Sequence, residues 1–140
     1  MKAFHLQILS PERRFYDGPC LSLLVPVSDG MMGIMADHYP LTAAIPDGEV
    51  IMTIPDDVRR SCAVTRGILD VSASRVRLLC ESALAPEEID EDADRRAMEE
   101  AQLQLREKQG QRDYILTQLA FARAVNNLKV KHHNAERLIK

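Results

Sequence analysis

The spacing of hydrophobic positions changes near Ala85–Pro86. Before this point Phe4, Leu6 and Ile8 alternate with polar residues, which is the two-residue period of a half-buried strand. Further apolar runs predict strands at 20–25, 58–64, 68–71 and 76–80. Turn signals between the runs are Ser10-Pro11-Glu12, Asp17-Gly18-Pro19, Asp29-Gly30 and Asp47-Gly48. Residues 1–85 are therefore predicted to form an all-β antiparallel sandwich. Parallel strands are not expected, because they would need crossover helices for which the chain has no room.

Residues 86–140 instead carry a helical period. One face of a first helix is predicted to hold Ala93, Ala97, Ala101 and Leu105, with Met98 widening it. Gly110 is a candidate helix stop, and Asp113 a candidate N-cap for a second helix. The inner face of that helix is predicted to hold Leu116, Ala120, Ala124 and Leu128. A short connection makes the two helices an antiparallel hairpin.

The predicted helix–helix contact is weak. Ala side chains bury little area, and apolar burial contributes roughly 25 cal/mol per Å². The second helix is also apolar almost all the way round from Ile115 to Val125. We therefore expect the hairpin to need a second surface, which is typical of a mobile element.

Charge is divided between the two ends of the hairpin. Acidic residues crowd the start of the first helix, at 87, 88, 90, 91, 92 and 94, where they suit the helix dipole. Basic residues crowd the end of the second helix, namely Lys129, Lys131, Arg137 and Lys140. In a closed hairpin the clusters should lie side by side, and opening would free the basic tail for an acidic partner. Solvated helix ends that obey the dipole preference are the simpler alternative.

Composition excludes several functional classes. The net charge of −3 and the 4% aromatic content argue against nucleic-acid binding. No apolar run reaches the roughly 20 residues of a membrane span, and no secretory signal core is seen, so a cytoplasmic location is expected. The 3 cysteines are widely spaced and are expected to be reduced, semi-buried small residues.

The sequence also lacks the short motifs of known catalytic and metal sites. There is no P-loop, nucleophile elbow or HExxH segment, so no catalytic or metal-binding residue is predicted. His38, beside Pro40, is interpreted as a structural hydrogen-bonding residue. His132 and His133 are adjacent on a predicted helix and point about 100° apart, so they cannot readily share a metal.

One run carries a family resemblance. Gly30-Met31-Met32-Gly33-Ile34-Met35-Ala36-Asp37-His38-Tyr39-Pro40-Leu41 resembles the G-x-x-G-I-x-x-x-H-x-P-L segment of the epsilon subunits of bacterial rotary, proton-translocating ATP synthases. Residues 5–18 look like the opening strand, turn and second strand of that family, and 67–71 look like its later G-I-L-x-V strand. The resemblance extends over nearly the whole chain.

The resemblance implies a non-catalytic regulatory and coupling subunit of the central rotor stalk. A flattened, barrel-like β-sandwich would dock on the gamma subunit and the c-ring. The hairpin would fold against the sandwich in one state, and in another it would extend towards the alpha and beta catalytic subunits and restrain ATP hydrolysis. The protein would be peripheral at the cytoplasmic face of the cell membrane, reaching it only through the complex. The resemblance implies interface candidates at Asp29, Gly30, Met31, Met32, Gly33, His38, Pro40 and Leu41. Met31 and Met32 either occupy the turn that faces the c-ring or pack as ordinary strand residues. Regulatory candidates in the hairpin are Arg123, Lys129, Lys131 and Arg137.

The chain departs from the family pattern at two places. Some relatives bind ATP through an I/L-D-x-x-R-A segment, but here Ala93 and Asp94 stand where Arg and Ala are needed. We therefore predict no tight ATP binding and no cofactor. Arg66 stands where many relatives carry Gly.

The alternative function is a free-standing β-sandwich interaction module that homodimerises through its helical hairpin.

Overall fold

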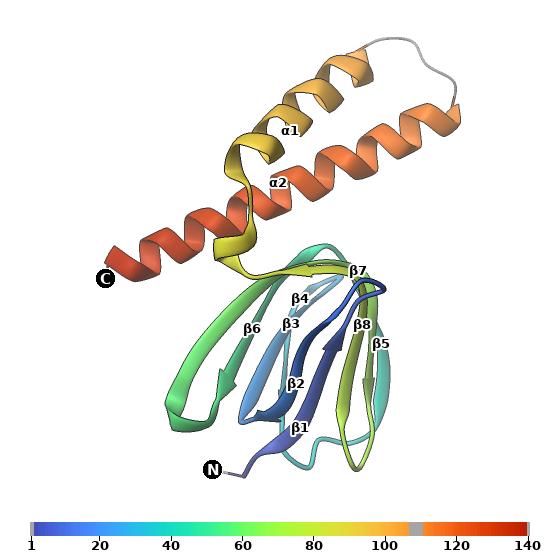
Figure 1. The fold of residues 1–140 in the computed structure, drawn as a ribbon. Coiled ribbons are helices and arrows are strands. Elements are labelled where there is room, and N and C mark those ends of the chain that lie inside the picture. Colours follow the sequence, from blue (N-terminus) through green and yellow to red (C-terminus); the bar gives the residue numbers. More distant parts are fainter. Residues whose placement is uncertain (1, 107–110, 140) are drawn as a thin grey trace. The chain divides into compact units, whose positions relative to one another are not determined.

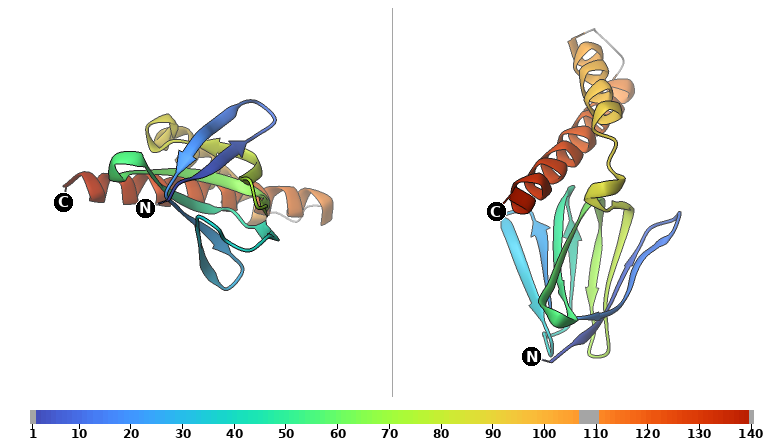
Figure 2. Two further views of the ribbon diagram at one scale, coloured as in Figure 1. Left: turned by 90° about the horizontal axis from the view of Figure 1, so that it is seen from below. Right: turned by 60° about the vertical axis from the view of Figure 1, so that its left-hand side comes forward.

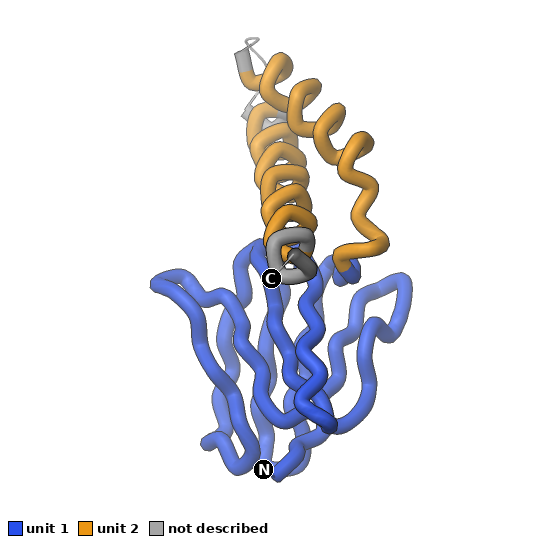
Figure 3. Tube along the Cα trace, turned by 90° about the vertical axis from the view of Figure 1, so that its left-hand side faces the viewer, with its two compact units in different colours: residues 1–85 blue, residues 86–140 orange. Residues whose placement is uncertain are grey.

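A computed structural model describes residues 2–106 and 111–139, with side chains over 2–105 and 114–134. The chain divides into two compact units, Met1–Ala85 and Pro86–Lys140 (Figure 3). The first unit is all β, apart from a single 3₁₀ turn, and the second is helical (Figure 1). The predicted fold class, a β-sandwich followed by a helical hairpin, is confirmed.

Eight strands build the first unit. They are β1 Phe4–Leu9, β2 Arg14–Cys20, β3 Ser22–Val27, β4 Gly30–Met35, β5 Leu41–Ile45, β6 Gly48–Ile54, β7 Val58–Val71 and β8 Val76–Leu84. A 3₁₀ turn, Pro55–Asp57, joins β6 to β7. The periodic runs had not predicted β4, β5 and β6 as separate strands.

The strands form one continuous sheet that folds into two layers through the long strand β7. The order is β2-β1-β8-β7-β6-β3-β4, with β5 also paired to β7. The first half of β7 pairs with β6, and its second half pairs with β5 and β8. The β1–β2 and β3–β4 hairpins therefore lie at opposite edges of the sheet (Figure 2).

One strand pair contradicts the expectation of a purely antiparallel sheet. β1 and β8 run parallel, with Leu6 opposite Val76 and Leu9 opposite Leu79. The other strand pairs of the described part are antiparallel. No crossover helix is needed, because β1 and β8 are the first and last strands and the six strands between them make the connection.

Two predicted strand boundaries were wrong. Asp17-Gly18-Pro19 is not a turn but lies inside β2, which is an edge strand where a proline without an N–H is tolerated. The runs at 58–64 and 68–71 form the single strand β7. Gly67 does not interrupt that strand, and a Cβ there would lie 2.0 Å from the Leu79 carbonyl oxygen.

The core between the layers is aliphatic, as the composition requires. Fully buried large side chains include Leu6, Ile8, Leu23, Ile34, Leu69 and Leu78. The three cysteines, Cys20, Cys62 and Cys80, are free, and they are buried rather than semi-buried as the sequence predicted. Burial raises the pKa of the Cys20 and Cys80 thiols to about 11 and raises that of Cys62 further.

The second unit begins with a 3₁₀ turn, Pro86–Glu88, and continues as α1 Glu91–Arg106 and α2 Gln111–Ile139. Asp90 caps α1, because its Oδ1 accepts a 3.0 Å hydrogen bond from the Ala93 amide. The predicted N-cap at Asp113 is wrong, since α2 begins two residues earlier. Gly110 lies outside the described residues. Within the described ranges, neither helix is long and apolar enough to cross a membrane.

The predicted alanine faces are only partly correct. Ala101 and Ala124 are buried between the helices, whereas Ala97, Leu116 and Ala120 are exposed. A four-residue repeat advances 400° per step, so it drifts about 40° round an α-helix at each repeat. Thr117 and Asn127 are buried in α2, so its inner face includes polar residues that the pattern did not identify.

Candidate functional site

The candidate run 29–41 begins at the turn between β3 and β4. Ser28 donates a 2.8 Å hydrogen bond to the Asp29 carboxylate within this turn, and Gly30 has a φ of 143° that favours glycine. Met31 and Met32 lie in β4, after the turn, which agrees with the alternative of ordinary strand packing. The Met31 side chain is 53% exposed, whereas Met32 packs against the core.

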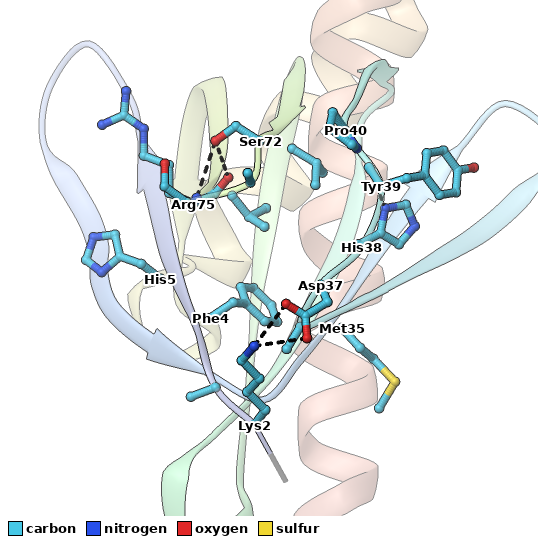
Figure 4. A pocket seen from close by; sticks show the side chains of 16 residues that line it. Lys2, Phe4, His5, Met35, Asp37, His38, Tyr39, Pro40, Ser72 and Arg75 are labelled. Atoms are coloured by element: carbon cyan, nitrogen blue, oxygen red, sulfur yellow. Dashed lines mark hydrogen bonds and ion pairs between the residues drawn. The ribbon is translucent and has the colours of Figure 1, made fainter.

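His38 and Pro40 lie in the loop that follows β4. His38 Nδ1 donates a 2.8 Å hydrogen bond to the Tyr39 carbonyl, and the two rings stack with centroids 4.4 Å apart. Both residues line a cavity of about 450 Å³ (Figure 4). Across it Lys2 Nζ lies 3.0 Å from each carboxylate oxygen of Asp37, which ties the N-terminal segment to this loop.

The candidate run therefore does not form one continuous surface. Gly30 pairs with Val27 at one end of β4, and Met35 pairs with Ser22 at the other. Asp29 and Gly30 belong to the first end of the sandwich, and His38, Pro40 and the start of β5 at Leu41 belong to the opposite end. Gly33 lies between them on the exposed part of β4.

A different surface brings apolar side chains together. On the outer face of the layer formed by β5, β7, β8 and β1, the strand register aligns one residue from each strand in a row. This apolar row consists of Ala44, Ile68, Leu79 and Leu9. Ile68 is 52% exposed and Leu79 is 45% exposed. The row lines a groove with Ser10, Pro11 and Gly67.

Polar residues border the apolar row on both sides. On one side Arg66 Nε lies 2.9 Å from Glu81 Oε1 in an exposed ion pair. Arg66 also donates its backbone N–H to Asp47 Oδ1 at 2.8 Å. Its side chain is partly exposed, so solvent accommodates a side chain at this position, where the family pattern has Gly.

On the other side a polar row crosses five strands. Its residues are Thr42, Asp70, Arg77, Gln7 and Asp17. Arg77 Nε donates a hydrogen bond to Gln7 Oε1 at 3.2 Å, and Thr42 Oγ1 donates one to Asp70 Oδ1 at 3.4 Å. Asp17 also pairs with His5 at 2.7 Å and with Arg14 at 3.2 Å. An apolar centre with a polar, charge-balanced border is the anatomy of a protein–protein interface.

The signal for the apolar row is present in the sequence. Ile8-Leu9, Ile68-Leu69 and Leu78-Leu79 each place two apolar residues in succession on a strand. Because successive side chains point to opposite faces, one of each pair must face outward. Such doubled positions indicate a sheet with both faces covered.

The regulatory candidates in the hairpin have different surroundings. Arg123 and Lys129 are exposed on α2. Lys131 is half-buried and its Nζ donates a 3.0 Å hydrogen bond to the Pro86 carbonyl. The Arg137 side chain lies outside the described residues. Within the described part, no group of three or more His, Cys, Asp or Glu could hold a metal ion.

Two family models match the chain. The beta-sandwich domain of the ATP synthase Delta/Epsilon chain matches residues 3–86, and its long alpha-helix domain matches residues 87–131. The chain belongs to the ATP synthase delta/epsilon family. The resemblance to epsilon subunits is confirmed, and family membership makes the chain a non-catalytic subunit of the synthase's rotor stalk.

Relatives match over almost their full length. The ATP synthase epsilon chain of Caldanaerobacter subterraneus subsp. tengcongensis is 34% identical over 92% of this chain and 94% of its own. That of Caldicellulosiruptor bescii is 32% identical over 99% of this chain and 100% of its own.

Solved structures share the fold at low identity. A chain of the Euglena gracilis mitochondrial ATP synthase (OSCP/F1/c-ring) aligns with a TM-score of 0.70 and 16% identity, covering 97% of this chain and 81% of that chain. A chain of the Tetrahymena thermophila mitochondrial ATP synthase central stalk and c-ring aligns with a TM-score of 0.62 and 10% identity, covering 93% and 97%.

Proposed function

We propose that this chain couples and regulates a proton-translocating ATP synthase from its central rotor stalk. The sandwich docks on the gamma subunit and the c-ring, and the hairpin restrains ATP hydrolysis by contacting the alpha and beta catalytic subunits. The complex lies at the cytoplasmic face of the cell membrane, and the chain reaches the membrane only through it.

The apolar row with its polar borders is the observation that carries the docking proposal. Ile68 and Leu79 are exposed side by side. Large apolar side chains that are exposed next to each other often mark a surface that another protein covers. We assign this face to the gamma subunit. The turn at Asp29 and Gly30 is not part of this row, and we assign it to the c-ring.

Binding to purified gamma subunit tests the docking surface. Ile68→Ser removes the centre of the row, and we expect the Kd for gamma to rise by roughly ten-fold or more, as for a central interface residue. Val58→Ser is the matched control, because Val58 is 47% exposed but lies outside the row. Equal effects of the two variants on the Kd would contradict this assignment.

The hairpin proposal rests on its weak internal packing and its exposed apolar side chains. The buried centre includes Ala101 and Ala124, which contribute little area. Near the loop end, large apolar side chains remain exposed at Leu103 (60%), Tyr114 (42%), Ile115 (48%), Leu116 (55%) and Leu119 (36%). These side chains suit a helix pair that exchanges one resting surface for another. Arg123, Lys129, Lys131 and Arg137 are proposed to meet acidic groups of the catalytic subunits.

A further inference from the structure

The contact between α1 and α2 contains polar side chains at two levels. Near the base Asn127 Nδ2 lies 3.4 Å from Asp94 Oδ1 and 3.3 Å from Oδ2. Nearer the loop Thr117 Oγ1 donates to Gln104 Oε1 at 3.3 Å. Asn127 is 7% exposed and Thr117 is 8% exposed, so neither can exchange its partner for bulk water in the closed hairpin.

The two contacts specify the same alignment of the helices. The number of residues from Asp94 to Gln104 along α1 equals the number from Thr117 to Asn127 along α2. Because the two helices run in opposite directions, one alignment makes both contacts. Ala101 lies between Asp94 and Gln104, Ala124 lies between Thr117 and Asn127, and both alanines are buried. Small alanines tolerate a slide of one helix along the other, whereas hydrogen-bonded pairs do not. The alignment is therefore set by the polar groups.

A slide of one turn that moves Asn127 towards the loop end of α1 would break the polar contact at the base. It would place Asn127 against Met98, whose thioether is only a weak acceptor. A buried amide without a partner is destabilising, because it loses its hydrogen bond to water and gains none in return. In the described part no buried side-chain nitrogen or oxygen lacks a partner, so the observed alignment avoids this penalty.

For the polar pair of Asp94 and Asn127, complete separation of the helices carries a smaller free-energy penalty than sliding. When α1 and α2 part, Asp94 and Asn127 both reach water, and water replaces the hydrogen bond that each of them loses. A polar pair inside a helix contact therefore favours one alignment at little gain in stability, as buried Asn does in coiled coils. This property suits a hairpin that must close correctly after each opening.

We propose that Asp94 and Asn127 form a polar latch that fixes the alignment of the closed hairpin. The latch refines the regulatory function proposed above and rests on it for its biological purpose. Its test uses the isolated full chain, without other synthase subunits. Failure of the latch is thereby distinguished from failure of the regulatory proposal, which is measured in the assembled enzyme.

Disulfide trapping reports the alignment directly. Gln104→Cys with Thr117→Cys joins the helices in the observed alignment, and Gln104→Cys with Phe121→Cys joins them after a slide of one turn. With the latch intact, we expect the first pair to oxidise at least about five-fold faster than the second. Adding Asp94→Ala should bring the two rates within about two-fold.

Matched variants separate the latch from a general effect of charge. Asp92→Ala removes a carboxylate that is 86% exposed on the same turn, and it should leave the rate ratio unchanged. Asp94→Asn keeps an acceptor for Asn127 and should preserve the ratio. Amide protection of the β-sandwich verifies that each variant is folded. An unchanged ratio in Asp94→Ala, or an equal change in Asp92→Ala, would overturn the proposal.

Discussion

Gly67 on β7 approaches the backbone of Leu79 on β8 more closely than any side chain would allow. A Cβ at Gly67 would lie 2.0 Å from the Leu79 carbonyl oxygen and 2.8 Å from Cys80 Cα. The contacted atoms are backbone, so they cannot rotate away. The two strands that approach here carry Ile68 and Leu79 of the apolar row.

Replacement of Gly67 by Ala should therefore destabilise the sandwich. We expect a loss of about 2–3 kcal/mol in the free energy of unfolding, the usual effect of overpacking, measured by urea denaturation. Gly33→Ala is the control, because its Cβ would meet only Leu24 Cδ2 at 3.6 Å. If both variants unfold at the same urea concentration, the strands are not as close as described.

The three cysteine thiols should be inert while the protein is folded. The pKa of Cys20 and of Cys80 is raised to about 11 by burial, so almost no thiolate exists at pH 8. We expect a disulfide reagent to react more than about 100-fold more slowly than with a free thiol. All 3 thiols should react promptly in denaturant. Rapid labelling of the native chain would contradict the burial.

The closed hairpin should lose stability as the pH rises from acid. The pKa of Asp94 is raised, first by burial and also by the nearby Asp90, while Asn127 and Arg123 act in the opposite direction. A carboxyl whose pKa is higher in the closed state favours closure at pH values below its ordinary pKa, and this contribution disappears as the pH rises past the raised pKa.

Hydrogen exchange of the α1 amides, corrected for the intrinsic effect of pH, measures this dependence. We expect protection to fall with rising pH in the native chain and to fall less in Asp94→Asn, which cannot titrate. Asp92→Asn is the control, and it should behave like the native chain. An identical pH profile in native and Asp94→Asn protein would contradict the effect of burial.

The chain should not bind ATP tightly. Asp90 is engaged in capping α1, and Ala93 and Asp94 occupy positions where the ATP-binding pattern of some relatives has Arg and Ala. The acidic side chains at the start of α1 also repel a triphosphate. Calorimetry with MgATP should detect no binding at micromolar concentrations, and a micromolar Kd would refute this prediction.

Sequence patterns identified the two units and the aliphatic core because these depend on the period of the apolar residues. They failed where tertiary context decides. Pro19 is compatible with β2 only because β2 is at the edge of the sheet. The pairing of Gln7 with Arg77 depends on the parallel contact of β1 with β8, which no local pattern reveals.

The interface candidates at 29–41 stay a prediction, but the sequence did not show how the fold distributes them. The run 29–41 was recognised as one segment, but β4 carries its two ends to opposite ends of the sandwich. The apolar row was missed because its residues come from four strands that are distant in sequence. The Asp94–Asn127 contact was missed because a strict four-residue repeat drifts off the helix face on which Asn127 lies.

ATP hydrolysis by the assembled synthase tests the regulatory role most directly. Complexes should be reconstituted with the full chain or with residues 1–85 alone, and the amount of bound chain should be measured in each. If the hairpin restrains hydrolysis, the truncated chain will assemble normally and the hydrolysis rate will rise. Normal assembly with an unchanged hydrolysis rate would contradict the account.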